Sequence, residues 1–216
     1  MMCLTLKGIS RFFLFLADSM YFTEAGAASC GQLKEEFEMN RFEKTSRITK
    51  MGMLAAISIV LVLLIRIPYP AAPYLVYDPA DIPIFIGTFA FGPLAGVILT
   101  AIVSFIQAFI LGGDGIIGFF MHFVATGAFV LVAGFIYKRN KTRKTAVIAL
   151  ICGTIIMTGS MLLWNLIITP IFLGVPREAV VAMLATILLP FNLLKAGINS
   201  IVTFLTYKSI ARFLHK

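Results

Sequence analysis

The stretch IIGFFMHFVATGAFVLVAGFIY, residues 116–137, decides the fold class of this chain. It contains no aspartate, glutamate, lysine or arginine, and it is as long as the roughly 20 residues that a helix needs to cross a bilayer. Its apolar residues follow one another without the strict alternation of a barrel strand, which favours a helix. The stretch therefore predicts a transmembrane helix, because a helix satisfies its own backbone groups inside lipid.

Apolar runs of the same kind fill the chain from about Lys50 onward. We expect an all-α integral membrane protein, a bundle of six transmembrane helices. Four prolines between Arg66 and Asp81 exclude regular helix there and predict a loop at the membrane interface. The helices are predicted at about residues 48–65, 79–91, 93–111, 116–137, 145–172 and 180–213, the last with an irregular start before Pro190.

The composition supports the same fold class. Hydrophobic residues make up 60% of the 216 residues and charged residues 13%, against about 25% charged residues in soluble domains. The net charge of +8 does not indicate nucleic-acid binding, because lysine and arginine cluster at the predicted helix ends. The three cysteines have neither a metal-binding spacing nor the pattern of a disulfide framework.

The distribution of basic residues predicts the orientation in a bacterial cell membrane. Residues 41–50, 138–144 and 208–216 are rich in lysine and arginine, and six crossings place all three segments on one side. Because cytoplasmic segments carry such an excess, we expect both termini in the cytoplasm. The opposite side has only Arg66 and Arg177.

Residues 1–38 differ from the membrane part of the chain. The short apolar run Phe12–Ala17 resembles a signal peptide until Asp18 interrupts it. Codons for Lys34-Glu35-Glu36 can contain a bacterial ribosome-binding site just upstream of Met39. Two interpretations stay open: a leader that is not translated, with the true start at Met39, and a translated leader that is disordered or amphipathic.

Polar residues inside the predicted spans indicate a binding site, because a charge in the membrane is costly and usually faces a partner, cavity or substrate. Asn192, Lys195 and Asn199 share one face of the last helix. No acidic residue of the predicted spans is available to Lys195, so a ligand or backbone carbonyls must neutralise it. Lys195 and Asn192 are expected to contact a ligand, and Asn199 to bond between helices. For Asn165 both roles stay open, and Trp164 is either a packing residue or a stacking wall.

Asp78, Asp81 and His122 have simpler explanations than catalysis or metal binding. Asp78 fits the N-cap of the second helix, and Asp81 lies near the positive end of its dipole. His122 is expected to be a packed hydrogen-bonding residue, and Ser104 and Gln107 to bond between helices. The chain has no phosphate loop, zinc-protease motif or hydrolase motif, so we expect neither an enzyme nor a cofactor or metal site.

Small residues form one face of the first helix. Gly52 and Ala56 are four residues apart, the spacing that lets two helices approach closely, and Ala55 lies beside them. The face predicts either docking onto another membrane protein or ordinary packing inside the bundle.

Four stretches make the chain resemble the substrate-binding S components of energy-coupling factor (ECF) transporters, in particular the riboflavin-specific type. The resemblance covers residues 39–216. Asp-Ile-Pro followed by Phe-Gly-Pro is typical of S components, and Pro-Phe-Asn-x-x-Lys favours riboflavin. The stretches are MGMLAA at 51–56, YDPADIP at 77–83 with FGPLAG at 91–96, MHFVATG at 121–127 and PFNLLK at 190–195.

The resemblance implies a six-helix subunit that binds riboflavin and works with a membrane coupling subunit and two ATPase subunits. It implies that Asn165, Asn192 and Lys195 read the ligand. The aromatic ring would be walled by phenylalanines and Trp164, and the loop from Arg66 to Tyr77, which includes Tyr74, would act as a lid.

The same resemblance assigns Gly52, Ala55 and Ala56 to contact with the coupling subunit. The family often shows Ala-x-x-x-Ala in this helix. Here Ile59 and Val60 follow four residues after the two alanines, so only Gly52 and Ala56 keep a small pair.

Ligand chemistry favours riboflavin but leaves alternatives. Riboflavin is neutral and flat, with a polar pyrimidine edge and a hydroxylated chain, which one lysine and two asparagines suit. A polyanionic vitamin would need more basic groups on the outer side. The alternatives are an S component for another vitamin or small metabolite, a stand-alone secondary transporter, and a membrane enzyme that uses Asp78, Asp81 and His122.

Overall fold

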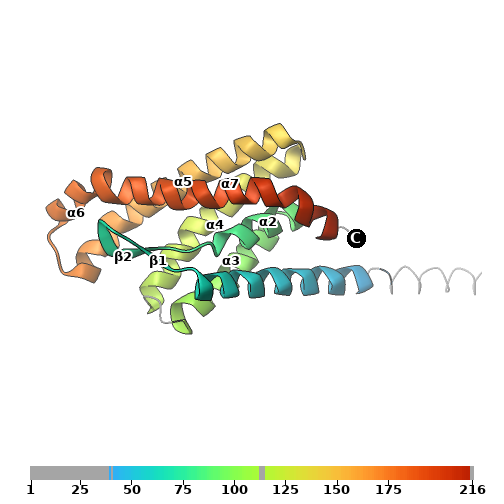
Figure 1. Ribbon diagram of the computed structural model, residues 1–216, viewed down its shortest axis with the longest axis horizontal. Coiled ribbons are helices and arrows are strands. Elements are labelled where there is room, and N and C mark those ends of the chain that lie inside the picture. Colours follow the sequence, from blue (N-terminus) through green and yellow to red (C-terminus); the bar gives the residue numbers. More distant parts are fainter. Residues whose placement is uncertain (1–38, 40, 112–114, 215–216) are drawn as a thin grey trace, which may run out of the picture. The chain divides into compact units, whose positions relative to one another are not determined.

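The computed structural model describes residues 39, 41–111 and 115–214 (Figure 1). The chain divides into two units, Met1–Ile48 and Thr49–Lys216, and the description below concerns the second unit. The predicted leader, residues 1–38, lies outside the described residues. The second unit is mostly helical, as the sequence predicts, and contains one small sheet.

The elements follow in the order helix, hairpin and a series of helices. The first helix, Arg41–Leu64, enters the second unit at Thr49. The remaining elements are β1 (Ile67–Tyr69), β2 (Ala72–Tyr77), α2 (Asp81–Phe91), α3 (Pro93–Phe109), α4 (Gly115–Arg139), α5 (Arg143–Leu173), α6 (Arg177–Met183), the π-helical turn η1 (Leu184–Leu188) and α7 (Leu189–Leu214).

The helix lengths are consistent with a multi-pass membrane protein, but they do not confirm six full crossings. Among the described residues, four helices are long and apolar enough to span a membrane: Arg41–Leu64, Gly115–Arg139, Arg143–Ile171 and Arg177–Tyr207. The other two predicted spans, α2 and α3, are apolar helices of 11 and 17 residues. At 1.5 Å per residue, α2 is about 16 Å long, roughly half of a hydrocarbon core of about 30 Å.

The proline-rich segment before α2 is a β-hairpin, where the sequence predicted a loop. β1 and β2 pair antiparallel, with Ile67 opposite Tyr77 and Pro68 opposite Val76, and the register shifts between Pro68 and Tyr69. Proline is tolerated in edge strands because its missing N–H is not needed on the unpaired side. The prolines therefore excluded a helix correctly, but they did not exclude a two-stranded ladder.

Glycine, proline and threonine set the helix ends. Gly92 has a φ of 95°, which a side chain would disfavour, and Pro93 then occupies the first turn of α3. Thr142 caps α5, because its Oγ1 accepts the Thr145 N–H at 3.2 Å. Gly174 ends α5 with a φ of 64° in the left-handed region.

The last helical segment begins irregularly, as predicted. The turn Leu184–Leu188 is π-helical and directly precedes α7, whose second residue is Pro190. Proline lacks an N–H, and its ring clashes with the carbonyl four residues earlier, so a locally widened helix accommodates it. Asn192 and Lys195 lie on the first turns after this widening.

Helix α4 packs at the centre of this unit, against α2, α3 and α5. Gly134 permits a close approach to α3, because an added Cβ would lie 2.8 Å from the Pro93 Cβ. Phe129 of α4 stacks on Phe85 of α2, with ring centroids 3.7 Å apart. Helix α7 packs against α2 and α5, so the buried core runs between these helices.

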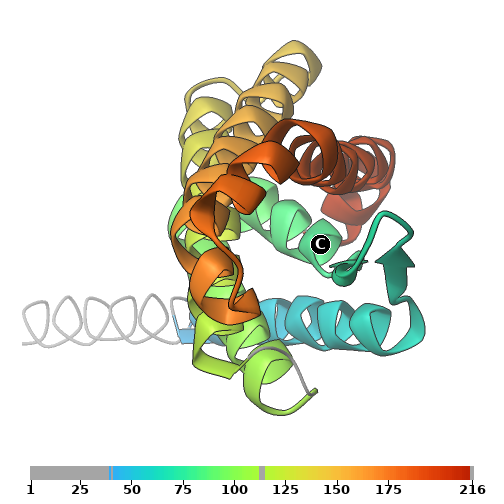
Figure 2. The same ribbon diagram turned by 90° about the vertical axis from the view of Figure 1, so that its left-hand side faces the viewer.

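The two ends of the bundle differ in what they carry. The hairpin and α6 lie at one end, which faces the viewer in Figure 2. The connection between α4 and α5 and the end of α7 lie at the other (Figure 1). The basic segment 138–144 and the basic end of the last helix are therefore together, and Arg177 is at the opposite end.

Candidate ligand pocket

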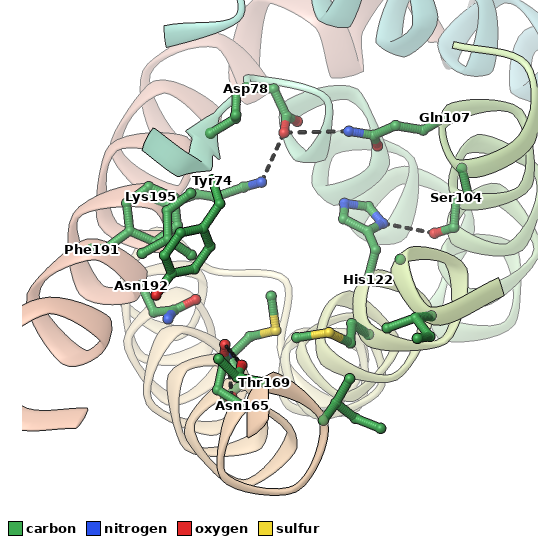
Figure 3. Close-up of a pocket in the computed structure, with 18 of the residues that line it drawn as sticks. Tyr74, Asp78, Ser104, Gln107, His122, Asn165, Thr169, Phe191, Asn192 and Lys195 are labelled. Carbon is green, nitrogen blue, oxygen red and sulfur yellow. Dashed lines mark hydrogen bonds and ion pairs between the residues drawn. The ribbon is translucent and has the colours of Figure 1, made fainter. Parts of the chain in front are cut away.

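A pocket of about 220 Å³ lies among the hairpin segment, α3, α4, α5 and α7 (Figure 3). Elements that are far apart in the sequence each contribute polar side chains to it. Apolar side chains, among them Met121, Met161 and Phe191, form much of the remaining lining. The polar lining residues are Arg66, Tyr74, Asp78, Ser104, Gln107, His122, Asn165, Thr169, Asn192 and Lys195.

Lys195 and Asp78 form a buried ion pair in the wall of this pocket. The Lys195 Nζ donates to Asp78 Oδ2 at 2.8 Å, and the two side chains are 9% and 5% exposed. The prediction that a ligand or backbone carbonyls must neutralise Lys195 is therefore wrong. Asp78 was not considered because it lies in the segment between spans, which the fold brings back against α7. The pair ties the end of the hairpin to α7.

The interpretation of the two aspartates as simple helix caps also needs correction. Helix α2 begins at Asp81, and Ala80 at its N-cap makes no side-chain cap hydrogen bond. Asp78 Oδ1 accepts the Ala80 N–H at 3.3 Å, so Asp78 does bond locally before the helix. Its other oxygen, however, binds Lys195. Among the described residues, no three His, Cys, Asp or Glu side chains form a metal-binding group.

Asp81 instead anchors an interhelical network behind the pocket. Its carboxylate accepts hydrogen bonds from Thr126 Oγ1 at 3.1 Å and from Asn199 Nδ2 at 3.3 Å. His122 Nε2 lies 3.3 Å from Asp81 Oδ1. Asn199 also accepts the Tyr77 hydroxyl at 3.0 Å, which confirms its predicted role in bonding between elements.

The two predicted amides, Asn165 and Asn192, both line the pocket. Asn192 Nδ2 donates to the Leu188 carbonyl at 2.8 Å, and Asn165 Nδ2 donates to the Met161 carbonyl at 2.7 Å. Thr169 donates to Asn165 Oδ1 at 2.9 Å. These bonds to the preceding helical turn orient both amides. They leave a second N–H on each amide, and the Asn192 oxygen, for a ligand.

Of the three aromatic residues that were predicted to contact the ligand, one lines the pocket and two do not. Tyr74 lines the pocket and is 37% exposed. Desolvation by burial raises the pKa of the Tyr74 phenol above its usual value, so the hydroxyl is a neutral donor at physiological pH. Tyr77 and Trp164 do not contribute to the lining of this pocket.

Three lining residues on α3 and α4 were not predicted to face a ligand. The Ser104 Oγ and His122 Nδ1 are 2.7 Å apart, and Gln107 Nε2 donates to Asp78 Oδ2 at 3.4 Å. Their predicted roles as hydrogen-bonding residues are confirmed. A signal for the site was present in the sequence, because Ser104 and Gln107 are three residues apart on one helical face of an otherwise apolar span.

The small-residue face of the first helix is only partly exposed. Gly52 is exposed, and a Cβ added there would meet no atom within 4 Å. Ala56 is exposed as well. Ala55 is 6% exposed and belongs to the hydrophobic core, so two of the three predicted contact residues remain on the surface.

Comparison with known proteins identifies a family over the same region. The model of the family "ECF transporter, substrate-specific component" matches residues 46–207. The riboflavin transporter RibU of Staphylococcus aureus is 33% identical over 181 residues, which are 81% of this chain and 95% of that protein. The riboflavin transporter FmnP of Bacillus subtilis is 32% identical over 169 residues, covering 74% of this chain and 88% of that protein.

Solved structures show the same fold. The S component of a bacterial ECF transporter matches with a TM-score of 0.68 and 33% identity, covering 80% of this chain and 99% of that one. The S component for biotin from an ECF-type transporter matches with a TM-score of 0.55 over 77% of this chain. Its identity of 19% makes it a likeness of fold alone.

Proposed function

The chain belongs to the substrate-specific components of ECF transporters, and from this premise we propose that its substrate is riboflavin. As a member of this family it is a membrane transport subunit rather than an enzyme. The printed names of its relatives RibU and FmnP, which are riboflavin transporters, support the choice of ligand. Within the pocket, the choice of riboflavin is supported by the combination of a paired lysine with two oriented amides.

The pairing of Lys195 with Asp78 suits a neutral ligand. A buried charge is costly unless it is paired, and here the 2.8 Å contact supplies the partner before any ligand arrives. The pocket wall around Lys195 is therefore close to neutral overall. Nζ still has donors to offer, because an ammonium carries three and Asp78 accepts one. A neutral molecule rich in carbonyls and ring nitrogens matches this surface better than a carboxylate would.

The two amides suit the polar edge of a flavin ring. The pyrimidine edge of riboflavin presents both acceptors and an N–H, and Asn192 offers an oxygen and an N–H to such an edge. Asn165 adds a second N–H from α5. Phe191 and two methionines supply apolar surface for the ring. Tyr74 on the hairpin provides a neutral hydroxyl at the same pocket.

We infer from the size of the pocket that the hairpin moves on binding. A volume of about 220 Å³ is below the range of about 300–1,000 Å³ that is usual for drug-sized ligands. Riboflavin therefore needs an outward shift of some lining residues. The hairpin carries Tyr74, Leu75 and Val76 into the lining and is a small two-stranded sheet, so it is the element with the least packing to lose.

The proposal includes the partners and the topology. The chain works with a coupling subunit and two ATPase subunits, and the exposed pair Gly52 and Ala56 forms part of the contact. Six membrane segments, with α2 and α3 as short ones, place both termini in the cytoplasm and the hairpin outside. The position of segment 138–144 and the end of α7 at one end of the bundle supports this orientation (Figure 1).

The absorption spectrum of the purified protein tests the proposed ligand. Protein isolated from riboflavin-containing medium should be yellow and should carry a flavin spectrum. The result that would exclude the proposal is a colourless protein that also fails to take up added riboflavin, while remaining folded by circular dichroism.

A further inference from the structure

Two polar atoms of pocket residues have no hydrogen-bond partner among the described residues. They are Gln107 Oε1 and His122 Nε2, and both atoms are shielded from solvent. Buried polar groups in native proteins are nearly always paired, and an unpaired one usually has an explanation in function or in a bound molecule. Both residues line the same pocket, on its α3 and α4 side (Figure 3).

The orientation of the Gln107 amide follows from its neighbour. Its Nε2 donates to Asp78 Oδ2, and a carboxylate accepts but does not donate, so the nitrogen must face Asp78. The free atom is therefore the oxygen, which is an acceptor. The same Asp78 oxygen holds Lys195 Nζ. Asp78 thus positions a donor from α7 and an acceptor from α3 around one pocket.

Among the described residues, His122 has an unpaired ring nitrogen, Nε2, which is a donor where the unpaired Gln107 atom is an acceptor. Its Nδ1 is 2.7 Å from the Ser104 hydroxyl, and with this hydroxyl as the donor the proton of a neutral imidazole is on Nε2. Nε2 lies 3.3 Å from Asp81 Oδ1 but without the geometry of a hydrogen bond. Other charged or titratable groups of the lining are Asp78, Lys195 and Arg66. Nε2 is therefore an N–H donor in the lining of the same pocket as the Gln107 acceptor.

We propose that Gln107 Oε1 and His122 Nε2 together bind one hydroxyl group on the flexible chain of the ligand. A hydroxyl is both donor and acceptor, so a single group satisfies both atoms. A ring N–H would satisfy only Gln107, and a carbonyl only His122.

This subsite lies across the pocket from the amides and Lys195. Figure 3 shows Gln107, Ser104 and His122 on one side and Lys195, Asn192 and Phe191 on the other. A flavin whose ring edge meets the amides directs its hydroxylated chain away from them. The inference rests on the proposed function, and it adds a residue-level basis for distinguishing riboflavin from a flavin without hydroxyls.

A comparison of riboflavin with lumiflavin, which has the same ring but a methyl group in place of the hydroxylated chain, tests the proposal. Gln107→Met keeps the length of the side chain and removes its acceptor. The contact with Asp78 is lost whichever flavin is bound, so riboflavin binding should weaken by about two- to tenfold more than lumiflavin binding, the usual loss for one hydrogen bond. Thr158→Val is the matched control, because Thr158 Oγ1 is also buried and unpaired but does not line the pocket.

A pair of His122 variants tests the second atom. The amide nitrogen of glutamine reaches the position of Nε2, whereas asparagine reaches only that of Nδ1. His122→Gln should therefore retain the preference for riboflavin over lumiflavin, and His122→Asn should lose it by about two- to tenfold. Retained lumiflavin binding shows that each variant is folded.

The outcomes separate this inference from the proposed function. If the parent protein binds neither flavin, the proposed function fails and the inference fails with it. If the parent binds riboflavin, two results overturn the inference alone. One is an equal loss of both flavins in Gln107→Met, which means that Gln107 acts only through Asp78. The other is no loss of either flavin, which means that an ordered water satisfies the two atoms.

Discussion

The Nζ of Lys195 lies 2.8 Å from the Oδ2 of Asp78, and this contact joins α7 to the end of the hairpin that forms one side of the pocket. The lysine that we propose to bind the ligand is thus held by the residue that directly follows the hairpin. Under the proposed function, this single carboxylate couples ligand binding to the position of the hairpin.

Breaking this pair from either side should destabilise the protein. Removing one partner of a buried ion pair leaves an unpaired charge, at a cost of about 3–5 kcal/mol, and replacing both partners is far milder. Lys195→Met and Asp78→Asn should each lower the thermal unfolding temperature in detergent. The double variant should recover much of the loss, since no unpaired charge remains.

Riboflavin binding separates the two roles of Lys195. Lys195→Met alone and together with Asp78→Asn should weaken binding by roughly tenfold to a hundredfold, because a charged donor is lost in both. Fluorescence quenching of riboflavin measures this affinity. A double variant that is stable and binds as tightly as the parent would make Lys195 a purely structural residue.

The oriented amides give a second prediction about affinity. Asn192→Leu removes one or two hydrogen bonds to the ligand and should weaken riboflavin binding by about tenfold. Trp164→Phe serves as a control, because Trp164 does not line the pocket and its replacement should not alter binding. Calorimetry on both variants checks this, and a larger effect at Trp164 would favour the stacking role considered from the sequence.

The small-residue face of the first helix contains two exposed residues, Gly52 and Ala56, and one buried residue, Ala55. Gly52→Leu and Ala56→Leu should reduce riboflavin uptake in the assembled transporter and leave binding by the isolated chain unchanged. Ala55 is 6% exposed, so Ala55→Leu should instead overpack the core and destabilise the chain by about 1–3 kcal/mol. Uptake and binding assays side by side measure the difference. Loss of binding at Gly52 or Ala56 would mean that this face packs within the protein.

Single cysteines test the orientation of the bundle. Lys141 and Arg177 are both exposed, on the α4–α5 connection and on α6. In a background without the native cysteines, Arg177→Cys should react with an impermeant thiol reagent in intact cells. Lys141→Cys should react only after permeabilisation. Labelling of both positions from the same side would contradict the proposed topology.

The sequence predicted the long helices well because their signal is local. The apolar run around residues 116–137 and the proline before the last helix each leave a direct mark on the chain. The hairpin was missed because its prolines break the sequence pattern of a strand. Each strand is also stabilised by hydrogen bonds to the other strand, and the pattern of a single strand does not show these bonds. Helix α2 was predicted as a span, but it has only 11 residues, most of them buried. The apolar sequence indicated its burial and not its length.

The pocket was predicted in part. Lys195 and Asn192 stood out because polar residues in an apolar helix are costly, and both line the pocket. Asp78, the partner of Lys195, could not be predicted from spacing, since it is 117 residues away in the sequence and lies outside the predicted spans. Gln107 was predicted to form a hydrogen bond between helices. The sequence could not predict that its nitrogen faces Asp78 and that its oxygen has no partner among the described residues.

A titration of the purified chain with riboflavin, followed by flavin fluorescence, tests the central claim most directly. We predict saturable quenching with one riboflavin per chain, and no displacement by an excess of biotin. Quenching that does not saturate, or displacement of the flavin by biotin, would contradict the assignment of this pocket to riboflavin.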